Sequence, residues 1–329
     1  MIIILNNIKN KIIIKKDLKN LRVYDIIYII VEAENMLKIN ANSKINLFLE
    51  ITGKLPSGYH TVDTVMQSVS LSDSLELELI RKTDGIKITC DIPGIPTDER
   101  NIAFRTAQAY LEATDADCGI RIGIKKSIPS EAGMGGGSAD GAAVLVGLNE
   151  LCGNLLGIKE LEAIASKYGA DIPFCIEGGT KRLIGIGTDT AETFSSPELS
   201  LVIAKPDGGV STPEAYRCLD KMFADFTDHQ PQLPTYLTEI LSGNNAAYSN
   251  ALFNRFEYVL DELCPSSKSL VSYLRDNSHG SLLCGSGAAV FAIADSTAHA
   301  KLLADRVKSE YADCAVWTAE TASRGCYII

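Results

Sequence analysis

Residues 129–140 read Pro-Ser-Glu-Ala-Gly-Met-Gly-Gly-Gly-Ser-Ala-Asp, between an alternating apolar stretch at 120–125 and a helical pattern from about 138 to 152. Four glycines let the backbone turn sharply and approach a ligand without interference from a Cβ atom. The free N–H groups and the dipole at the start of the following helix attract phosphate. A plain strand-to-helix turn also uses glycine, but a cluster this dense directly before a helix favours a phosphate-binding loop.

Other nucleotide-binding motifs do not fit this loop. A Walker A loop ends in Gly-Lys-Ser or Gly-Lys-Thr, and neither triplet occurs in the chain. A dinucleotide fingerprint begins with a glycine at the strand end, whereas residues 126–132 intervene here before Gly133. The H-R-D and D-F-G signatures of protein kinases are also missing from the sequence. The remaining candidate is the loop of the GHMP kinases, P-x-x-x-G-x-G followed by small residues.

Two further segments resemble the same superfamily, which is named for galactokinase, homoserine kinase, mevalonate kinase and phosphomevalonate kinase. One is Ser-Lys-Ile-Asn-Leu-Phe-Leu at 43–49, and the other is Cys-Gly-Ser-Gly-Ala-Ala-Val-Phe at 284–291. The resemblance runs from about Met36 to the C-terminus. It implies an α+β, two-lobed GHMP kinase fold, with an N-terminal lobe like domain 2 of ribosomal protein S5 and a ferredoxin-like C-terminal lobe.

Residues 58–61, Gly-Tyr-His-Thr, and 169–174, Gly-Ala-Asp-Ile-Pro-Phe, are similar to one branch of this superfamily. Its members act in the non-mevalonate isoprenoid pathway on a cytidyl diphosphate alcohol, and the resemblance implies ATP and Mg²⁺ as cofactors. It assigns proton acceptance to Asp171 and stabilisation of the transferred phosphoryl group to Lys44. A turn carboxylate and a half-exposed strand lysine are the commoner roles for such residues, and only the family match favours catalysis.

The resemblance also implies the residues that bind the two substrates. Tyr59 and Tyr216 are expected to stack on opposite faces of cytosine, and His60 is expected to bond its edge. Ser138 is a candidate Mg²⁺ contact, although a serine at a helix start can equally be an N-cap. The residues expected to bind ATP are Pro129, Gly133, Gly135, Gly136, Gly137, Ser138, Asn101 and Lys126. The residues expected to bind the acceptor are Asn46, Tyr59, His60, Thr212, Tyr216, Gly285 and Gly287.

The composition limits the range of partners. The net charge is −10 and the pI about 5.0, which argues against binding nucleic acid or an anionic membrane. The 329 residues include nine cysteines without a C-x-x-C pair and four histidines without a metal-binding array. These patterns argue against a disulfide framework and a structural zinc site. We therefore expect reduced thiols, a cytoplasmic location, a small-molecule substrate, and a monomer or homodimer.

The sequence predicts three regions. Residues 1–35 are rich in Ile, Asn and Lys and carry no motif, so we interpret them as an extension outside the family fold. Residues 36–205 are predicted to form an ATP-binding N-terminal domain, and residues 206–329 a C-terminal substrate domain. Hydrophobic periodicity predicts both strands and helices in each domain, including a strand near 174–176.

Two alternative functions stay open at this point. The first is another GHMP kinase that acts on homoserine, mevalonate or a sugar, but residues 58–60 argue against it because those acceptors have no base to stack. The second is a non-catalytic nucleotide-binding protein on the same fold. The presence of both Lys44 and Asp171 argues against this second alternative.

We predict that a chain beginning at Met36 folds and turns over like the full-length chain, because the segment before it carries no motif. The measurement compares the melting temperature and kcat of the two purified chains. A large loss in either quantity would show that residues 1–35 contribute to the folded protein.

Overall fold

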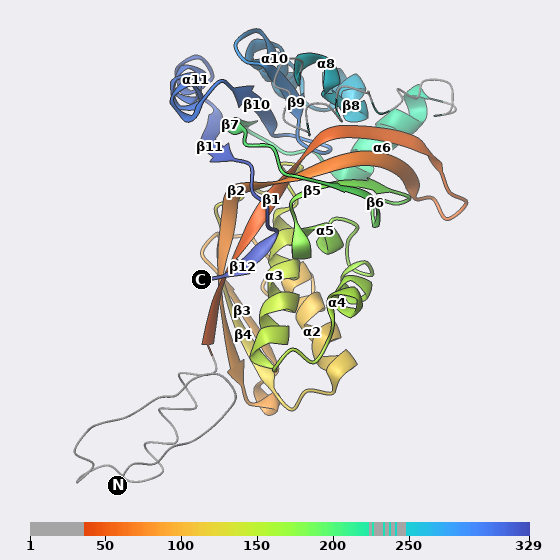
Figure 1. Cartoon of the computed structure of the whole chain (residues 1–329), viewed down its shortest axis with the longest axis vertical. Coiled ribbons are helices and arrows are strands. Elements are labelled where there is room, and N and C mark those ends of the chain that lie inside the picture. Colours follow the sequence, from red (N-terminus) through yellow and green to blue (C-terminus); the bar gives the residue numbers. More distant parts are fainter. Residues whose placement is uncertain (1–35, 224–225, 227–232, 234–236, 238–240, 242–247) are drawn as a thin grey trace, which may run out of the picture.

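The computed structural model describes residues 36–223, 226, 233, 237, 241 and 248–329, so the predicted extension at 1–35 lies outside the described residues. Two β-sheets, each packed against helices, form a two-lobed molecule (Figure 1). The α+β, two-lobed architecture predicted from the sequence is confirmed.

The first sheet has eight strands in the order β12-β1-β2-β4-β3, with β5 and β6 attached through β2 and with β8 beside β1. Helices α2, α3, α4 and α5 gather on one face of it (Figure 1). The strands are β1 (Met36–Lys54), β2 (His60–Ile80), β3 (Ile86–Cys90), β4 (Gly119–Lys125), β5 (Thr180–Ile184), β6 (Asp189–Phe194), β8 (Phe253–Asn254) and β12 (Cys326–Ile328). The helices of this lobe are η1 (Lys82–Asp84), α2 (Ile102–Thr114), α3 (Gly136–Leu151), α4 (Ile158–Ala165) and α5 (Ile172–Glu177).

The second sheet has four antiparallel strands in the order β11-β7-β10-β9, and α10 and α11 pack against it. Its strands are β7 (Ser200–Pro206), β9 (Gly280–Leu283), β10 (Val290–Ala294) and β11 (Cys314–Glu320). The helices described in this lobe are α6 (Thr212–Met222), α8 (Tyr248–Ala251), η3 (Arg255–Val259), α9 (Leu260–Leu263), α10 (Pro265–Asp276) and α11 (Thr297–Glu310).

The two sheets do not divide the chain at a single point. Strand β7 belongs to the second sheet although it lies almost wholly before residue 206, and β12 returns to the first sheet from the end of the chain. The C-terminal segment is held there by a backbone hydrogen bond of 2.8 Å from Gly325 to Glu177. The functional division between residues 36–205 and 206–329 stays a prediction.

Strands β1 and β2 form a long hairpin that runs from the first lobe to the second (Figure 1). Its register shifts at three places, between Asn42 and Ser43, between Asn46 and Phe48, and between Ile51 and Gly53. Such irregularities bend a strand and redirect its side chains. The first two of them flank Lys44 and Asn46, both of which are buried, so this part of the hairpin can carry polar groups into the interior.

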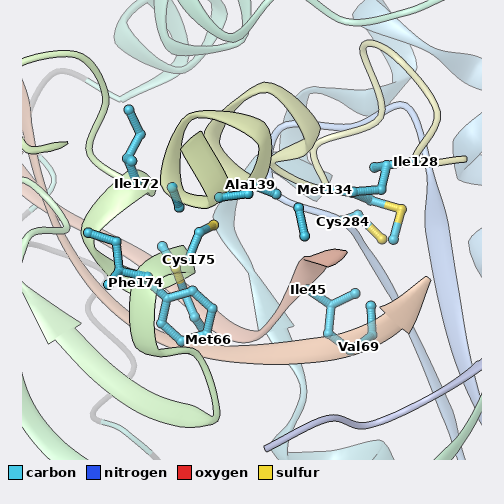
Figure 2. Close-up of a cluster of buried hydrophobic side chains, with 14 of the residues drawn as sticks. Ile45, Met66, Val69, Ile128, Met134, Ala139, Ile172, Phe174, Cys175 and Cys284 are labelled. Carbon is cyan, nitrogen blue, oxygen red and sulfur yellow. The ribbon is translucent and has the colours of Figure 1, made fainter. Parts of the chain in front are cut away.

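The apolar core of the first lobe extends directly beneath the glycine loop (Figure 2). Met134 from the loop is 1% exposed and lies among the buried side chains of Ile128, Cys284 and Val69. A fully buried side chain of this size gives the loop a stable anchor, of the order of 2 kcal/mol relative to an exposed position.

The strand predicted near 174–176 is wrong, because these residues belong to helix α5. A short buried apolar run has the same appearance in a strand and in a helix. Pro173 lies in the first turn of α5, where its fixed φ angle suits a helix, and Gly178 ends the helix at φ +72°.

A buried ion pair joins β1 to η3. Arg255 donates two hydrogen bonds of 2.7 Å to the carboxylate of Glu50, and the two side chains are 2% and 1% exposed. The guanidinium also lies over the rings of Phe223, Phe253 and Tyr258, at 5.1 to 5.4 Å from their centroids. Burial raises the pKa of Glu50, and the hydrogen bonds from Arg255 oppose that rise.

We predict that Glu50→Gln lowers the free energy of unfolding by about 3 kcal/mol, because it removes the carboxylate charge that pairs with the buried guanidinium of Arg255. Urea unfolding of the two proteins measures the difference. The matched control is Asp261→Asn, which breaks the exposed pair with Lys268 and should cost less than about 1 kcal/mol. Equal effects of the two substitutions would contradict the prediction.

Candidate active site

A cavity of about 930 Å³ lies where the glycine loop, β1, the β1–β2 turn, α6 and the turn after β9 meet. Of the site residues predicted from the sequence, only Gly287 is not part of the cavity wall. A Cβ atom added to Gly287 would contact Leu283 and Val210 instead. The predicted residues that line the cavity are Lys44, Asn46, Tyr59, His60, Asn101, Lys126, Pro129, Gly133, Gly135, Gly136, Gly137, Ser138, Asp171, Thr212, Tyr216 and Gly285.

The glycine loop presents the start of α3 to the cavity. Gly135 is the N-cap residue, in the left-handed region at φ +70°, and it provides no side chain to cap the helix. The first turn of α3 carries no acidic residue. The N–H groups and the positive end of the helix dipole are therefore available to an anionic group such as a phosphate.

The loop is held against both sheets by backbone hydrogen bonds. On one side, Lys44 N–H donates to Met134 O at 3.1 Å. On the other, Ala288 N–H donates to Glu131 O at 3.0 Å. A Cβ atom on Gly133 would lie 1.8 Å from Cys284 O, so only glycine allows this approach, and its φ of +71° is also in the left-handed region.

A chain of polar contacts runs from β1 to the start of α5. The Lys44 ammonium lies 3.3 Å from an oxygen of Asp171 and 3.0 Å from Asn46 Oδ1. Asn46 in turn donates a hydrogen bond of 2.8 Å to Thr64, whose hydroxyl bonds to Phe48 O at 2.7 Å. These contacts hold the Lys44 side chain, which is 6% exposed, in one place beside the cavity.

Asp171 has the geometry of a carboxylate free to act in the cavity. It occupies the N-cap position of α5, yet its side chain makes no capping hydrogen bond there. The side chain is 29% exposed, and a Cβ atom on Gly135 would lie 3.7 Å from Asp171 Oδ2. The carboxylate is thus beside both the glycine loop and Lys44.

Lys126 is engaged in a buried ionic cluster. Its ammonium bonds to the carboxylates of Asp73 and Asp140, the latter at 2.7 Å, and its side chain is 8% exposed. Burial raises the pKa of Asp140 to about 7. Asp73 also accepts hydrogen bonds of 2.6 and 2.8 Å from the N–H groups of Ser127 and Ile128. The cluster fixes the entry to the glycine loop, and nucleotide contact by Lys126 stays a prediction.

Two other predicted nucleotide-side residues have distinct local roles. Asn101 caps α2, because its Oδ1 accepts from Ala103 N–H at 2.9 Å while its Nδ2 donates to Pro96 O at 2.7 Å. Ser138 lies in the first turn of α3 and is not its N-cap residue. The hydroxyl of Ser138 therefore belongs to the turn that faces the cavity.

Aromatic side chains gather at the other end of the cavity. Tyr59 lies in the β1–β2 turn and is 67% exposed. The rings of His60 and Tyr216 stack at 4.4 Å with an interplanar angle of 13°, and Phe256 meets Tyr216 edge to face at 5.0 Å. The imidazole thus covers one face of Tyr216. The stacking of a base between Tyr59 and Tyr216 stays a prediction.

Sequence reasoning missed several polar residues of the cavity wall, among them Lys54, Asp220 and Ser286. Ser286 bonds to Thr212 across 2.8 Å, and Asp220 bonds to both Lys54 and His60. Two features of the sequence could have predicted the contacts of Asp220 with Lys54 and His60. Asp220 follows Tyr216 by four residues and so lies on the same helix face, and Lys54 precedes His60 across a short turn.

Family comparison decides the class of protein. The GHMP kinases N terminal domain matches residues 101–179, and the GHMP kinases C terminal domain matches residues 237–313. The chain is 37% identical over 294 residues to the 4-diphosphocytidyl-2-C-methyl-D-erythritol kinase of Synechococcus sp. (strain JA-2-3B'a(2-13)), an alignment that covers 87% of this chain and 94% of the relative. The chain belongs to the GHMP kinase family.

A second relative places this GHMP kinase in the same branch. It is the 4-diphosphocytidyl-2-C-methyl-D-erythritol kinase of Desulfitobacterium hafniense (strain Y51), which is 35% identical over 297 residues, with 88% of this chain and 98% of the relative covered. The chain is therefore an ATP-dependent small-molecule kinase.

Solved structures agree with this assignment. A crystal structure of 4-(cytidine 5'-diphospho)-2C-methyl-D-erythritol kinase superposes with a TM-score of 0.72 at 29% identity, covering 87% of this GHMP kinase and 99% of that chain. Mevalonate kinase of L. major superposes with a TM-score of 0.67 at 18% identity, with 87% and 96% covered. The second match shows the fold alone.

The described part of this GHMP kinase contains neither a candidate membrane span nor a cluster of potential metal ligands. Within it, no helix has the length and apolar character needed to cross a membrane. Over the same residues, three or more His, Cys, Asp or Glu side chains nowhere gather as a metal-binding cluster.

We predict that Gly133→Ala lowers kcat/KM by about a hundredfold or more, because the loop would have to leave the carbonyl of Cys284 and misplace the bound phosphates. ADP release measures the effect. The control is Gly123→Ala in β4, where a Cβ atom makes only ordinary contacts of 3.7 Å or more. Normal turnover in Gly133→Ala would show that the close approach is dispensable.

Proposed function

We propose that this GHMP kinase transfers the γ-phosphoryl group of ATP to the 2-hydroxyl of 4-diphosphocytidyl-2-C-methyl-D-erythritol, in the non-mevalonate synthesis of isoprenoid precursors. One observation carries the proposal. The open start of α3, the Lys44–Asp171 pair and the aromatic group of Tyr59, His60 and Tyr216 line one cavity. The first two suit phosphoryl transfer, and the third suits an acceptor that carries a base.

The residues around the Lys44–Asp171 pair have complementary roles in this proposal. Asp171 accepts the proton of the acceptor hydroxyl as that oxygen attacks the γ-phosphorus. Lys44 lies 3.3 Å from Asp171 and stabilises the charge that develops on the transferred phosphoryl group. Asn46 holds Lys44 at this point through a hydrogen bond of 3.0 Å. The N–H groups at the start of α3 hold the phosphates of ATP.

The donor set at the start of α3 fits Mg²⁺. This ion keeps several of its waters and is usually bound through one or two protein oxygens together with substrate phosphates, so it needs no cluster of carboxylates. Ser138 and Asp171 both line the cavity and supply a hydroxyl and a carboxylate oxygen. When bound to the nucleotide, Mg²⁺ would neutralise part of the phosphate charge.

Thr212, Ser286 and Gly285 form another part of the cavity wall, in which the hydroxyls of Thr212 and Ser286 lie 2.8 Å apart. We propose that this part of the wall contacts the diphosphate and the alcohol of the acceptor.

We further propose a cytoplasmic location, which suits nine cysteines without a disulfide framework. The choice between a monomer and a homodimer stays a prediction.

The proposal is tested by ADP release with a panel of acceptors. We expect 4-diphosphocytidyl-2-C-methyl-D-erythritol to have a far higher kcat/KM than homoserine, mevalonate or galactose. A better rate with any of the other three would leave the GHMP kinase assignment standing and overturn the proposed acceptor.

We predict that Asp171→Asn and Lys44→Ala each lower kcat by about a hundredfold or more while ATP binding is retained. The reason is that both groups act on the reacting phosphoryl group, whereas the glycine loop holds the nucleotide. The double variant should lose much less than the product of the two single effects, because the two groups act as a unit. Steady-state kinetics and titration with an ATP analogue provide the measurements.

The control for these variants is Asp305→Asn in α11, where the carboxylate is 77% exposed and lies outside the cavity wall. It should keep normal turnover. Near-normal turnover in Asp171→Asn would overturn its assignment as the proton acceptor.

A further inference from the structure

Lys54, Asp220 and His60 form a polar network at the aromatic end of the cavity. Asp220 Oδ1 accepts from His60 Nε2 at 2.7 Å, and Asp220 Oδ2 accepts from Lys54 Nζ at 2.6 Å. Lys54 and His60 face each other across the β1–β2 turn, whereas Asp220 comes from α6. The network therefore joins the two elements that carry Tyr59 and Tyr216.

The His60 ring is held on its faces as well as at its edge. Tyr216 stacks on it at 4.4 Å and Phe226 meets it edge to face at 5.6 Å. The side chain is 5% exposed yet forms part of the cavity wall. Among the described residues, no hydrogen bond engages Nδ1. A ring fixed in this way presents a defined pattern of donor and acceptor rather than an average over orientations.

The carboxylate decides which ring nitrogen carries the proton. A carboxylate only accepts hydrogen bonds, so Nε2 must carry the proton that Asp220 accepts. In the neutral imidazole the lone pair is then on Nδ1, which becomes an acceptor. An acceptor at this point matches the 4-amino group of cytosine, which donates, and opposes the 4-carbonyl group of uracil, which accepts.

We propose that Asp220, held by Lys54, is the positioning residue that makes His60 selective for a cytosine base. The inference rests on the proposed function and extends it to the origin of base selectivity. Stacking on tyrosine accepts any base because every base has a π-face, so selectivity has to come from a hydrogen bond. Asp220 acts on that bond through His60.

Lys54 makes Asp220→Asn an informative change. The Lys54 ammonium has only donors, so it binds the oxygen of the new amide and turns the NH₂ group toward His60. That NH₂ group needs an acceptor on Nε2, which moves the ring proton to Nδ1. The variant should therefore present a donor where the wild-type chain presents an acceptor. Adding Lys54→Met releases the amide, whose oxygen can then accept from Nε2 again.

The experiment measures kcat/KM for the cytidine acceptor and for its uridine analogue. We expect Asp220→Asn to lower the cytidine-to-uridine ratio by about tenfold, the effect of one hydrogen bond, mainly through KM. The Lys54→Met/Asp220→Asn double variant should recover part of that ratio. In the His60→Ala background, Asp220→Asn should leave the ratio unchanged, because the residue through which it acts is gone.

A spectroscopic measurement reads the proton position directly. ¹⁵N shifts of labelled histidine in the full chain, which has four histidines, are assigned with the His60→Ala variant. We expect the proton on Nε2 in the wild-type chain and on Nδ1 in Asp220→Asn. The ratio of the affinities for CDP and UDP measures the same preference for cytosine over uracil without catalysis. This binding measurement replaces the kinetic one for any variant whose turnover is too low to measure.

Controls separate positioning from a purely structural contribution. Glu214→Ala removes an exposed carboxylate from the same helix, outside the cavity wall, and should leave the ratio unchanged. Equal losses for both acceptors in Asp220→Asn, or a proton that stays on Nε2, would overturn the inference and leave the proposed function intact. A wild-type chain that does not turn over the cytidine acceptor would overturn the proposed function as well.

Discussion

The close approach of the glycine loop to the turn after β9 is the constraint on which the rest of the site depends. Gly133 lies so near Cys284 O that no side chain fits, and backbone hydrogen bonds from Lys44 and Ala288 fix the loop on both sides. Met134 anchors it in the apolar core below (Figure 2). Because the loop is held in this way, the start of α3 points into the cavity without a side-chain cap of its own.

The long β1–β2 hairpin connects the two ends of the cavity. Near its middle, between two register shifts, it carries Lys44 and Asn46, and at its turn it carries Tyr59 and His60. The same hairpin also holds the buried pair of Glu50 with Arg255, which fixes β1 against the second lobe. One continuous element thus sets the distance between the proposed reacting groups and the aromatic groups, which suits the proposed acceptor with a base at one end and a hydroxyl at the other.

Much of the site was predictable from the sequence, although its local geometry was not. The glycine loop, Asp171 in the segment 169–174, and the segment after Cys284 were found because their residue types and order are specific to the family. The strand near 174–176 was wrong, since a short buried apolar run does not distinguish strand from helix. The burial of Lys126 between Asp73 and Asp140 was also not predictable, because these three residues come from separate segments.

The sequence by itself determined the class of protein, the order of its motifs and the residue types available for chemistry, because these depend on local pattern and spacing. Only the tertiary structure decided which of those residues meet. Asp220 is 160 positions from His60, and Arg255 is 205 from Glu50, so no periodicity along the chain relates them. Hydrogen bonds and ion pairs act over a few ångströms in space. Their partners are therefore set by how the two sheets pack, which local sequence does not encode.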